Sequence, residues 1–131
     1  IHPADKKSVG DRLAFLALVN DYGYKGIDAE TPLPVDFKYE EGQVIVTFSA
    51  GEMGLCPLSK DVDGFELAGE DGVFYPAKAI VLWNAPHKVL VYKCPQVQKP
   101  VAVRYGMKNW SEATLFNCSG IPISPFRSDN Y

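Results

Sequence analysis

Apolar residues recur at two different spacings along the chain, and the change of spacing divides it into two parts. Near the beginning, Val9, Leu13, Leu16 and Ala17 follow helical spacing, and further apolar residues widen this stripe over most of the circumference. The pattern predicts a helix over about 7–22, ended by Gly23. Because such a helix is apolar nearly all round, we expect it to be buried on several sides.

The spacing becomes two after a connection rich in glycine and proline over 24–34. Apolar residues alternate with polar ones over 35–40. Val44, Val46 and Phe48 then alternate with Ile45 and Thr47, and Glu41-Gly42 lies between the two runs. This arrangement is typical of a β-hairpin. Further strands are expected at 64–68, 77–83, 88–92, 101–105 and 114–116, with connections at Asp71-Gly72, at Asn84 to His87 and at Gln96 to Pro100. Several short strands at this rhythm predict an antiparallel sandwich or barrel.

Composition narrows the class of protein. A chain of 131 residues that is 47% hydrophobic and 22% charged has room for one hydrophobic core and is too apolar to be disordered. The net charge is -3 and the basic residues are scattered, so the sequence predicts no basic surface that would bind nucleic acid. The longest apolar runs are much shorter than the roughly 20 residues of a membrane-spanning helix. We therefore expect neither a nucleic acid nor a membrane as partner.

The three cysteines, Cys56, Cys94 and Cys118, are widely spaced and form no C-x-x-C pair. This spacing predicts no zinc cluster, and it is compatible with one disulfide and one thiol.

Two histidines are the candidates for acid–base chemistry. His87 follows Pro86 in an expected turn, where a solvated structural residue is the favoured interpretation. His2 lies in Ile1-His2-Pro3, in a loop just ahead of the expected helix. Loops held by a rigid element are a common place for catalytic residues, so His2 is the stronger candidate.

The surroundings of His2 resemble a known family. Ile1-His2-Pro3 followed by Val9-Gly10 and Arg12-Leu13-Ala14 is similar to the end of the catalytic domain in sialate O-acetylesterase-like SGNH hydrolases. The resemblance extends to the end of the chain through Phe48, Gly54-Leu55, Gly64 to Gly69, Pro100 to Tyr105, Asn117, Gly120-Ile121-Pro122, Ser124 to Arg127 and Asp129.

The resemblance implies a fold class, a division into domains and one catalytic residue. It implies a mainly β chain: the terminal helix of an SGNH α/β (flavodoxin-like) domain over 1–23, then a small antiparallel β-sandwich-like domain over 24–131. His2 would be the general base of the catalytic triad. The serine nucleophile, the acidic residue and the oxyanion donors of the family have no counterpart here, so we expect this chain to be the C-terminal part of a larger esterase and inactive alone.

The resemblance also sets the expected ligands and location. The substrate would be an acetylated carbohydrate, of the sialic acid or acetylated xylan type, and the partner would be the N-terminal portion of the same enzyme that carries the serine. A serine–histidine mechanism requires no cofactor or metal. We expect a secreted or periplasmic protein.

Other residues with useful chemistry have a favoured structural interpretation. Asp5 is expected to act in the loop or as a cap, and the serines lack the G-x-S-x-G setting of a nucleophile elbow. Trp83 and Trp110 could form a platform for stacking sugars, although packing in a core or an interface is favoured. Arg104, and Arg127 with Asp129, could bind an acidic sugar, although structural ion pairs are favoured. The alternative for the whole chain is a stand-alone β-sandwich that binds carbohydrate or another partner without catalysis.

Overall fold

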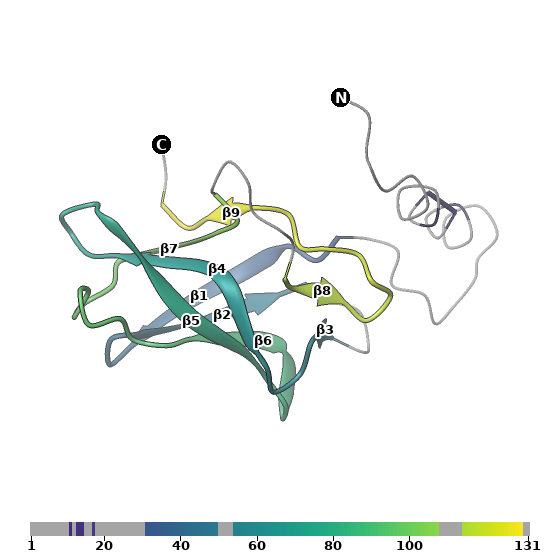
Figure 1. The fold of residues 1–131 in the computed structure, drawn as a ribbon, viewed down its shortest axis with the longest axis horizontal. Helices are drawn as coiled ribbons and strands as arrows, with labels where there is room; N and C mark the ends of the chain where they lie inside the picture. Colours follow the sequence, from purple (N-terminus) through teal and green to yellow (C-terminus); the bar gives the residue numbers. More distant parts are fainter. Residues whose placement is uncertain are drawn as a thin grey trace.

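The computed structural model describes residues 11, 13, 14, 17, 31–49, 54–107 and 114–129. Its ordered elements are β-strands, which Figure 1 shows in chain order. They are β1 (Pro34–Glu40), β2 (Gln43–Phe48), β3 (Leu55–Cys56), β4 (Asp61–Ala68), β5 (Phe74–Leu82), β6 (Ala85–Val91), β7 (Ala102–Tyr105), β8 (Phe116–Asn117) and β9 (Phe126–Arg127).

The hairpin β1–β2 forms where the alternating pattern predicts it. Glu40 pairs with Gln43, so the turn consists of Glu41 and Gly42, whose φ angles are 49° and 85°. Both residues are left-handed, which is the conformation that a two-residue hairpin turn requires and that glycine adopts without strain. The apolar side of β2 is fully buried, and the predicted hairpin is confirmed.

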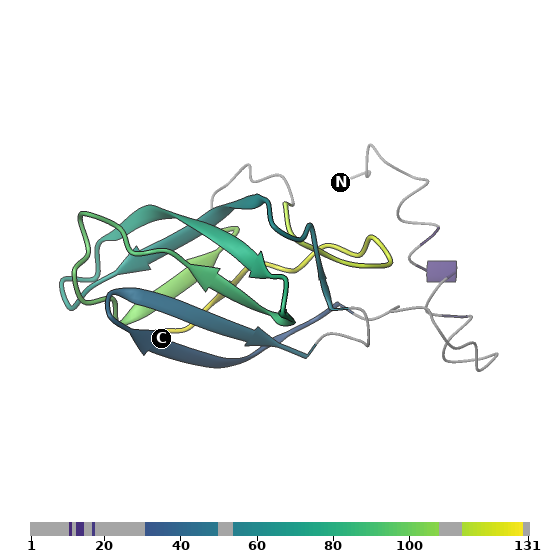
Figure 2. The same ribbon diagram turned by 90° about the horizontal axis from the view of Figure 1, so that it is seen from below.

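Seven strands form one antiparallel sheet in the order β1-β2-β6-β5-β4-β7-β9. The sheet curls, so its two outer strands approach each other (Figures 1 and 2). Side chains join these two edges: the rings of Phe37 and Phe126 lie 6.0 Å apart, and the hydroxyl groups of Tyr39 and Ser128 are hydrogen-bonded at 3.0 Å. The result is a nearly closed barrel.

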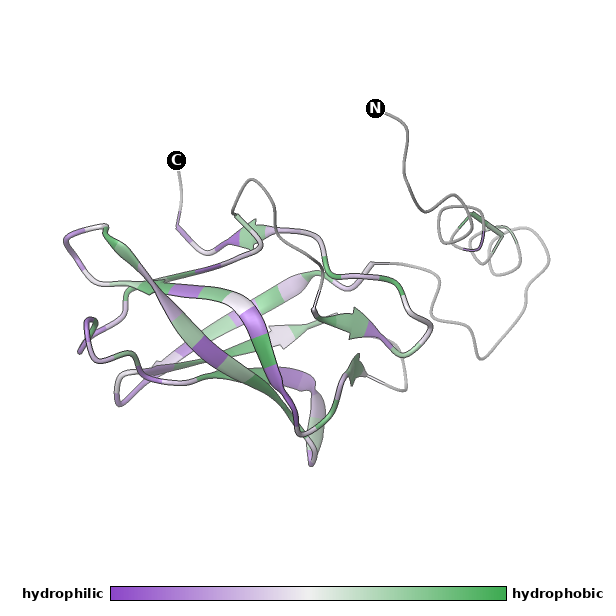
Figure 3. Cartoon of the chain, in the orientation of Figure 1, coloured by the Kyte–Doolittle hydropathy of each residue, from purple (hydrophilic) through white to green (hydrophobic). Residues whose placement is uncertain are grey.

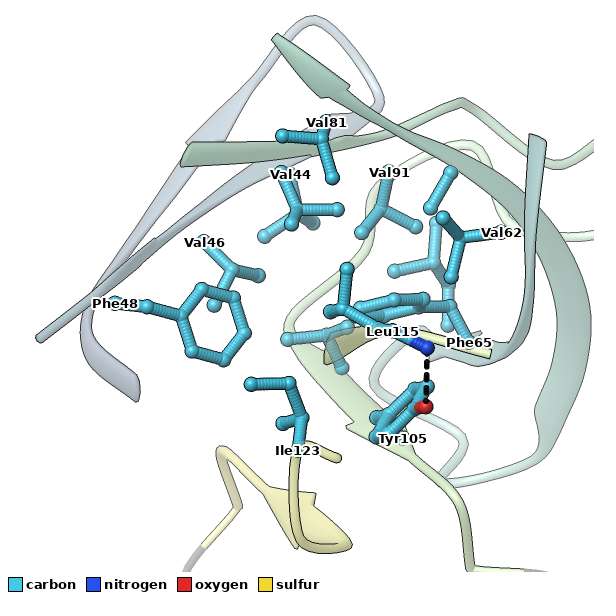
Figure 4. Packing of buried hydrophobic residues seen from close by; sticks show 14 of the residues in the cluster. Val44, Val46, Phe48, Val62, Phe65, Val81, Val91, Tyr105, Leu115 and Ile123 are labelled. Atoms are coloured by element: carbon cyan, nitrogen blue, oxygen red, sulfur yellow. Dashed lines mark hydrogen bonds between the residues drawn. The ribbon is translucent and has the colours of Figure 1, made fainter. Parts of the chain in front are cut away.

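The inside of the barrel is filled mainly by valine and aromatic side chains. Branched side chains suit the pleated surface of a sheet. Figure 3 shows hydrophobic and hydrophilic residues alternating along several strands. Phe126 from the C-terminal tail lies among the rings of Phe37, Phe48, Phe65 and Tyr105, at centroid distances of 5.6 to 6.1 Å. Figure 4 shows the buried cluster beneath these rings, which includes Val44, Val46, Val62, Val81, Val91, Leu115 and Ile123.

A second, two-stranded sheet of β3 and β8 lies beside the barrel (Figure 1). The buried amide of Asn117, 1% exposed, organises the turn after β8: its Oδ1 accepts hydrogen bonds from the backbone N–H of Ser119 at 3.0 Å and of Ile121 at 2.8 Å. The hydroxyl of Tyr105 accepts the N–H of Leu115 at 3.3 Å (Figure 4). These bonds satisfy backbone N–H groups that do not pair with another strand of the main sheet.

The fold class predicted from the sequence is wrong. The seven strands of the main sheet form one curled sheet rather than a two-layer sandwich, because β6 pairs with β2 on one side and with β5 on the other and so leaves no break between layers. No terminal helix of an α/β domain is among the elements of the described residues. Asp11, Leu13, Ala14 and Ala17 have helical backbone conformation, but most of the predicted helix lies outside the described residues.

The burial predicted for that helix is also not seen at Leu13, which is 64% exposed. The apolar pattern indicates that the side chain has a preference for burial, but no partner that would cover it lies among the described residues.

The strand positions predicted from the sequence agree with the structure better than the predicted fold class does. The strands expected near 64–68, 77–83, 88–92, 101–105 and 114–116 correspond to β4, β5, β6, β7 and β8. The predicted turn from Asn84 to His87 is too long, since β6 already begins at Ala85. Pro86 is tolerated there because pairing of β2 with β6 begins only at Lys88, so its missing N–H interrupts no ladder with β2. Within the described residues, no helix is both long and apolar enough to cross a membrane.

Candidate functional site

The predicted catalytic base, His2, lies outside the described residues, as do Asp5, Ser8, Trp110 and Ser111. The assignment of His2 therefore stays a prediction. His87 is described: it is the third residue of β6 and is half-buried, so it belongs to a strand rather than to a solvated turn.

The described serines with the clearest contacts support the backbone. The hydroxyl of Ser49 accepts the N–H of Leu33 at 3.0 Å and fixes the chain just before β1. The hydroxyl of Ser128 accepts the N–H of Val103 at 2.9 Å and joins the two barrel edges through Tyr39. Both hydroxyl groups hold strands together, and neither stands on the strand–turn–helix elbow that exposes a nucleophile.

Arg104 and Arg127 are held in structural ion pairs, as the favoured interpretation predicts. Nε of Arg104 lies 3.3 Å from Oε1 of Glu66, whose carboxylate is buried, and its guanidinium carbon lies 3.9 Å from the centre of the Phe74 ring. Arg127 binds Asp129 through two bonds, at 2.9 and 2.7 Å, which fixes the tail beyond β9. Both guanidinium groups are thus engaged with a carboxylate, Arg127 in the bidentate geometry that these groups favour and Arg104 through one longer contact.

For Trp83, packing in a core or an interface is the favoured interpretation, and the structure excludes only the core of this chain. Trp83 lies in the turn between β5 and β6 and is 76% exposed, so in this chain it is not a core residue. Leu58, which is 45% exposed, forms a bridge to Val81 near the same end of β5. Leu33, 59% exposed, lies just before β1 and next to the end of β2. We call Leu33, Leu58 and Trp83 the apolar end.

A concave surface lies at the opposite end of the strands. The turn between β4 and β5 and the loop that follows β6 enclose a concavity of about 440 Å³. We call it the polar basin, and its lining consists of Gly69, Glu70, Asp71, Gln96, Val97, Gln98 and Lys99. β5 runs from the neighbourhood of this basin at Phe74 to the neighbourhood of Trp83 at Leu82, so the two features are separated by the length of a strand.

Short-range hydrogen bonds fix the two walls of the polar basin. Oδ1 of Asp71 accepts the N–H of Val73 at 3.1 Å in an Asx turn, which suits the tight connection before β5. In the facing wall, the thiol of Cys94 donates to Oε1 of Gln96 at 2.8 Å, and the N–H of Val97 bonds to the carbonyl of Cys94 at 3.0 Å. The side chains of the basin are therefore presented by tight turns.

The polar basin has groups suited to binding a polar ligand. Two carboxylates, two amides and one ammonium group supply both acceptors and donors of hydrogen bonds, which suit a ligand with many hydroxyl groups. The lining holds no histidine and no serine, so it does not contain the serine–histidine pair expected of this esterase. Among the described residues, no cluster of three or more His, Cys, Asp or Glu could hold a metal ion.

Sequence reasoning missed the polar basin, although both of its walls were identified as connections. Asp71-Gly72 and the segment from Gln96 to Pro100 were expected as loops, and the sequence carried no signal that the two loops meet. Their meeting depends on the pairing of β4, β5 and β6 in one sheet.

No protein-family model matches the chain, and no curated protein matches it. A solved structure does: a carbohydrate acetylesterase from Xanthomonas citri is 34% identical to the chain over 99% of its length, with a TM-score of 0.81. The chain covers only 29% of that enzyme. The chain is thus related to one part of a carbohydrate acetylesterase, and a relation to carbohydrate esterases is supported.

Proposed function

We propose that this chain is the C-terminal part of a serine carbohydrate esterase, of the sialate O-acetylesterase-like SGNH type, that removes O-acetyl groups from glycans. The observation that carries the proposal is the likeness to a carbohydrate acetylesterase, at 34% identity over nearly the whole chain. The motifs around His2 and along the rest of the chain support the finer assignment. Acetylated sialic acid and acetylated xylan are the substrate types that the motifs favour.

In the proposed mechanism His2 is the general base. The imidazole takes the proton of the serine hydroxyl as its oxygen attacks the acetyl carbonyl, and it then gives this proton to the departing sugar oxygen, which leaves as a hydroxyl group. Water, activated by the same imidazole, releases acetate from the acetyl-enzyme. We place the serine, the orienting acid and the oxyanion donors in a portion of the enzyme that precedes Ile1.

The described residues agree with this division of labour. Ser49, Ser128, Arg104 and Arg127 hold the barrel together, and the lining of the polar basin contains no serine and no histidine. The barrel would thus support the enzyme and contribute no reacting group. We further propose a secreted or periplasmic location, where acetylated glycans are accessible.

The apolar end suggests how the barrel is attached. Leu33, Leu58 and Trp83 are 59, 45 and 76% exposed, and the described strands begin at this end, with β1. Large apolar side chains with this degree of exposure are common at interfaces between domains. We propose that the portion carrying the serine packs against the apolar end.

The sequence that precedes Ile1 tests the proposal. It should hold an acidic residue two or three positions ahead of His2 and, further upstream, an α/β pattern with a nucleophilic serine. A gene that encodes no upstream α/β region with such a serine would refute the assignment.

The second candidate is a stand-alone module that binds carbohydrate without catalysis, and the polar basin is the observation that favours it. A stand-alone module should be a stable monomer when residues 1–131 are expressed alone. The esterase assignment instead predicts that residues 1–131 tend to aggregate, and that a fragment that starts at Tyr24 is more soluble. Comparing the soluble yield of the two chains distinguishes the candidates.

A further inference from the structure

Two of the three cysteines meet at the small sheet beside the barrel. Cys56 is the second residue of β3, and Cys118 directly follows β8. The two strands are antiparallel, with Leu55 opposite Asn117 and Cys56 opposite Phe116. This pairing brings together two sulfur atoms that are 62 positions apart in the sequence, and they lie 2.7 Å from each other.

The geometry suits a covalent bond between them. Sulfur atoms in a disulfide are about 2.05 Å apart, so a shift of only about 0.7 Å separates the observed arrangement from a bonded one. Both side chains are half-buried rather than enclosed, so a small oxidant can reach them.

The third cysteine belongs to a different environment. Cys94 is 5% exposed and lies in the wall next to the polar basin, where its thiol donates to the side chain of Gln96 at 2.8 Å. Leu58, two residues after Cys56, bridges to Val81 at one end of β5, whereas the basin lies at the other end. The structure therefore separates one pair from one single cysteine.

We propose that Cys56 and Cys118 form a disulfide in the working protein, by exchange with a small-molecule disulfide such as oxidised glutathione. One cysteine loses its proton to solvent, and its thiolate attacks a sulfur of the oxidant and releases one glutathione. The second cysteine, also deprotonated, attacks the mixed disulfide and releases the other glutathione. The pair loses two electrons, and the oxidant becomes two molecules of reduced glutathione.

The bond would stabilise the weakest part of the fold. β3 and β8 contain two residues each, and a sheet of this size is marginal without other support. A cross-link between residues 62 apart removes many conformations from the unfolded chain. Disulfides persist in oxidising compartments, so the inference agrees with a secreted or periplasmic location. It goes beyond the proposed esterase function and holds or fails independently of it.

Counting thiols in the full chain tests the inference without any substitution. The chain of 131 residues is incubated with oxidised glutathione, freed of it, unfolded in guanidinium and allowed to react with a chromogenic thiol reagent. We expect one thiol per molecule, and a peptide map in which the peptides of Cys56 and Cys118 are joined. Three thiols per molecule, or a bond that includes Cys94, would overturn the proposal.

Variants show whether the bond stabilises the fold. We expect dithiothreitol to lower the melting temperature of the oxidised wild type and of Cys94→Ala by on the order of 10 °C. Cys56→Ser and Cys118→Ser should melt at the same temperature with and without the reductant. If the wild type showed no response to dithiothreitol, or if the Cys56→Ser variant responded as strongly, the pair would not be bonded. The thiol count decides the question even if a variant does not fold.

Discussion

Single polar side chains hold several segments of this protein in place, and Asn117 is the clearest case. Its amide is 1% exposed and accepts two backbone N–H groups, from Ser119 and Ile121. A buried donor that loses its acceptor retains the cost of desolvation and gains nothing in return.

We therefore expect Asn117→Ala to lower the free energy of unfolding by about 2–3 kcal/mol. Asp71→Ala is the matched control, because Asp71 also accepts a backbone N–H, that of Val73, but in an exposed turn. Its loss should cost less than about 1 kcal/mol, since water can replace the acceptor. Urea denaturation followed by circular dichroism measures both values, and equal losses would contradict the role of burial.

Ion pairs offer a second comparison at the residue scale. The carboxylate of Glu66 is 9% exposed and faces Arg104, whereas the pair of Lys38 and Glu40, at 2.8 Å, is 63 and 45% exposed. Arg104→Met should lower the free energy of unfolding by about 2 kcal/mol, because a buried charge loses its partner. Lys38→Met should change it by less than about 0.5 kcal/mol. A larger effect of Lys38→Met in the same urea titration would refute this account.

At the scale of elements, short-range signals were sufficient to predict the hairpin β1–β2. Glu41-Gly42 supplies the left-handed turn, and the alternation on β2 supplies a buried face. The strand β9 could not be predicted in this way. Phe126 has no local pattern around it, and it becomes a strand residue only because it pairs with Tyr105, which lies 21 positions earlier.

Proline misled the prediction at β6 for a similar reason. Pro86 and its neighbours have the composition of a turn, but Ala85 pairs with Leu82 and the strand begins there. Gly54 packs directly against Pro86, and a residue with a side chain would not fit in its place. A Cβ at this glycine would lie 2.6 Å from Cβ of Pro86. Such a close approach between distant segments is a property of tertiary structure and is not visible in the sequence around either residue.

The apolar end leads to a prediction about interdomain packing. In the larger esterase that we propose contains this chain, Trp83→Ser should lower the melting temperature by several degrees, because a side chain that is 76% exposed here would be buried there. The same substitution in residues 1–131 alone should leave the melting temperature nearly unchanged. Val73→Ser is the control, since Val73 is 47% exposed near the opposite end of β5. Calorimetry that gave the same shift for Trp83→Ser in both chains would argue against packing at this end.

At the scale of the whole molecule, the apolar alternation indicated a chain rich in strands but not how the sheet closes. The choice between a sandwich and a barrel depends on which strands become neighbours, and the order β1-β2-β6-β5-β4-β7-β9 includes three non-consecutive neighbours. Closure then depends on contacts such as Tyr39 with Ser128, which are 89 positions apart. Neither the strand order nor these long-range contacts can be predicted from the spacing of neighbouring residues.

The candidate site was predicted only as far as motifs allow. The resemblance around His2 predicts a base, but this residue lies outside the described part of the chain, and its partners are expected elsewhere in the enzyme. The polar basin and the Cys56–Cys118 pair depend instead on strands that meet across the fold, so sequence motifs did not indicate them.

The barrel itself should be independent of the segment before it. The members of its hydrophobic cluster lie between Phe37 and Phe126, so a fragment that starts at Tyr24 retains the whole cluster. We expect this fragment to unfold cooperatively in urea with a midpoint close to that of residues 1–131. A broad, non-cooperative transition of the fragment would show that the first 23 residues are required for folding.

The central claim is that this chain carries the base of a carbohydrate O-acetylesterase but cannot act alone. Acetate release from acetylated xylan and from O-acetylated sialic acid, measured for residues 1–131, the whole enzyme and its His2→Ala variant, tests this claim most directly. We predict no release by residues 1–131, release from one of the two substrates by the whole enzyme, and a loss of at least about 1,000-fold in the variant, whose fold stays intact by circular dichroism. Release by residues 1–131 alone, or an undiminished rate in the variant, would contradict the account.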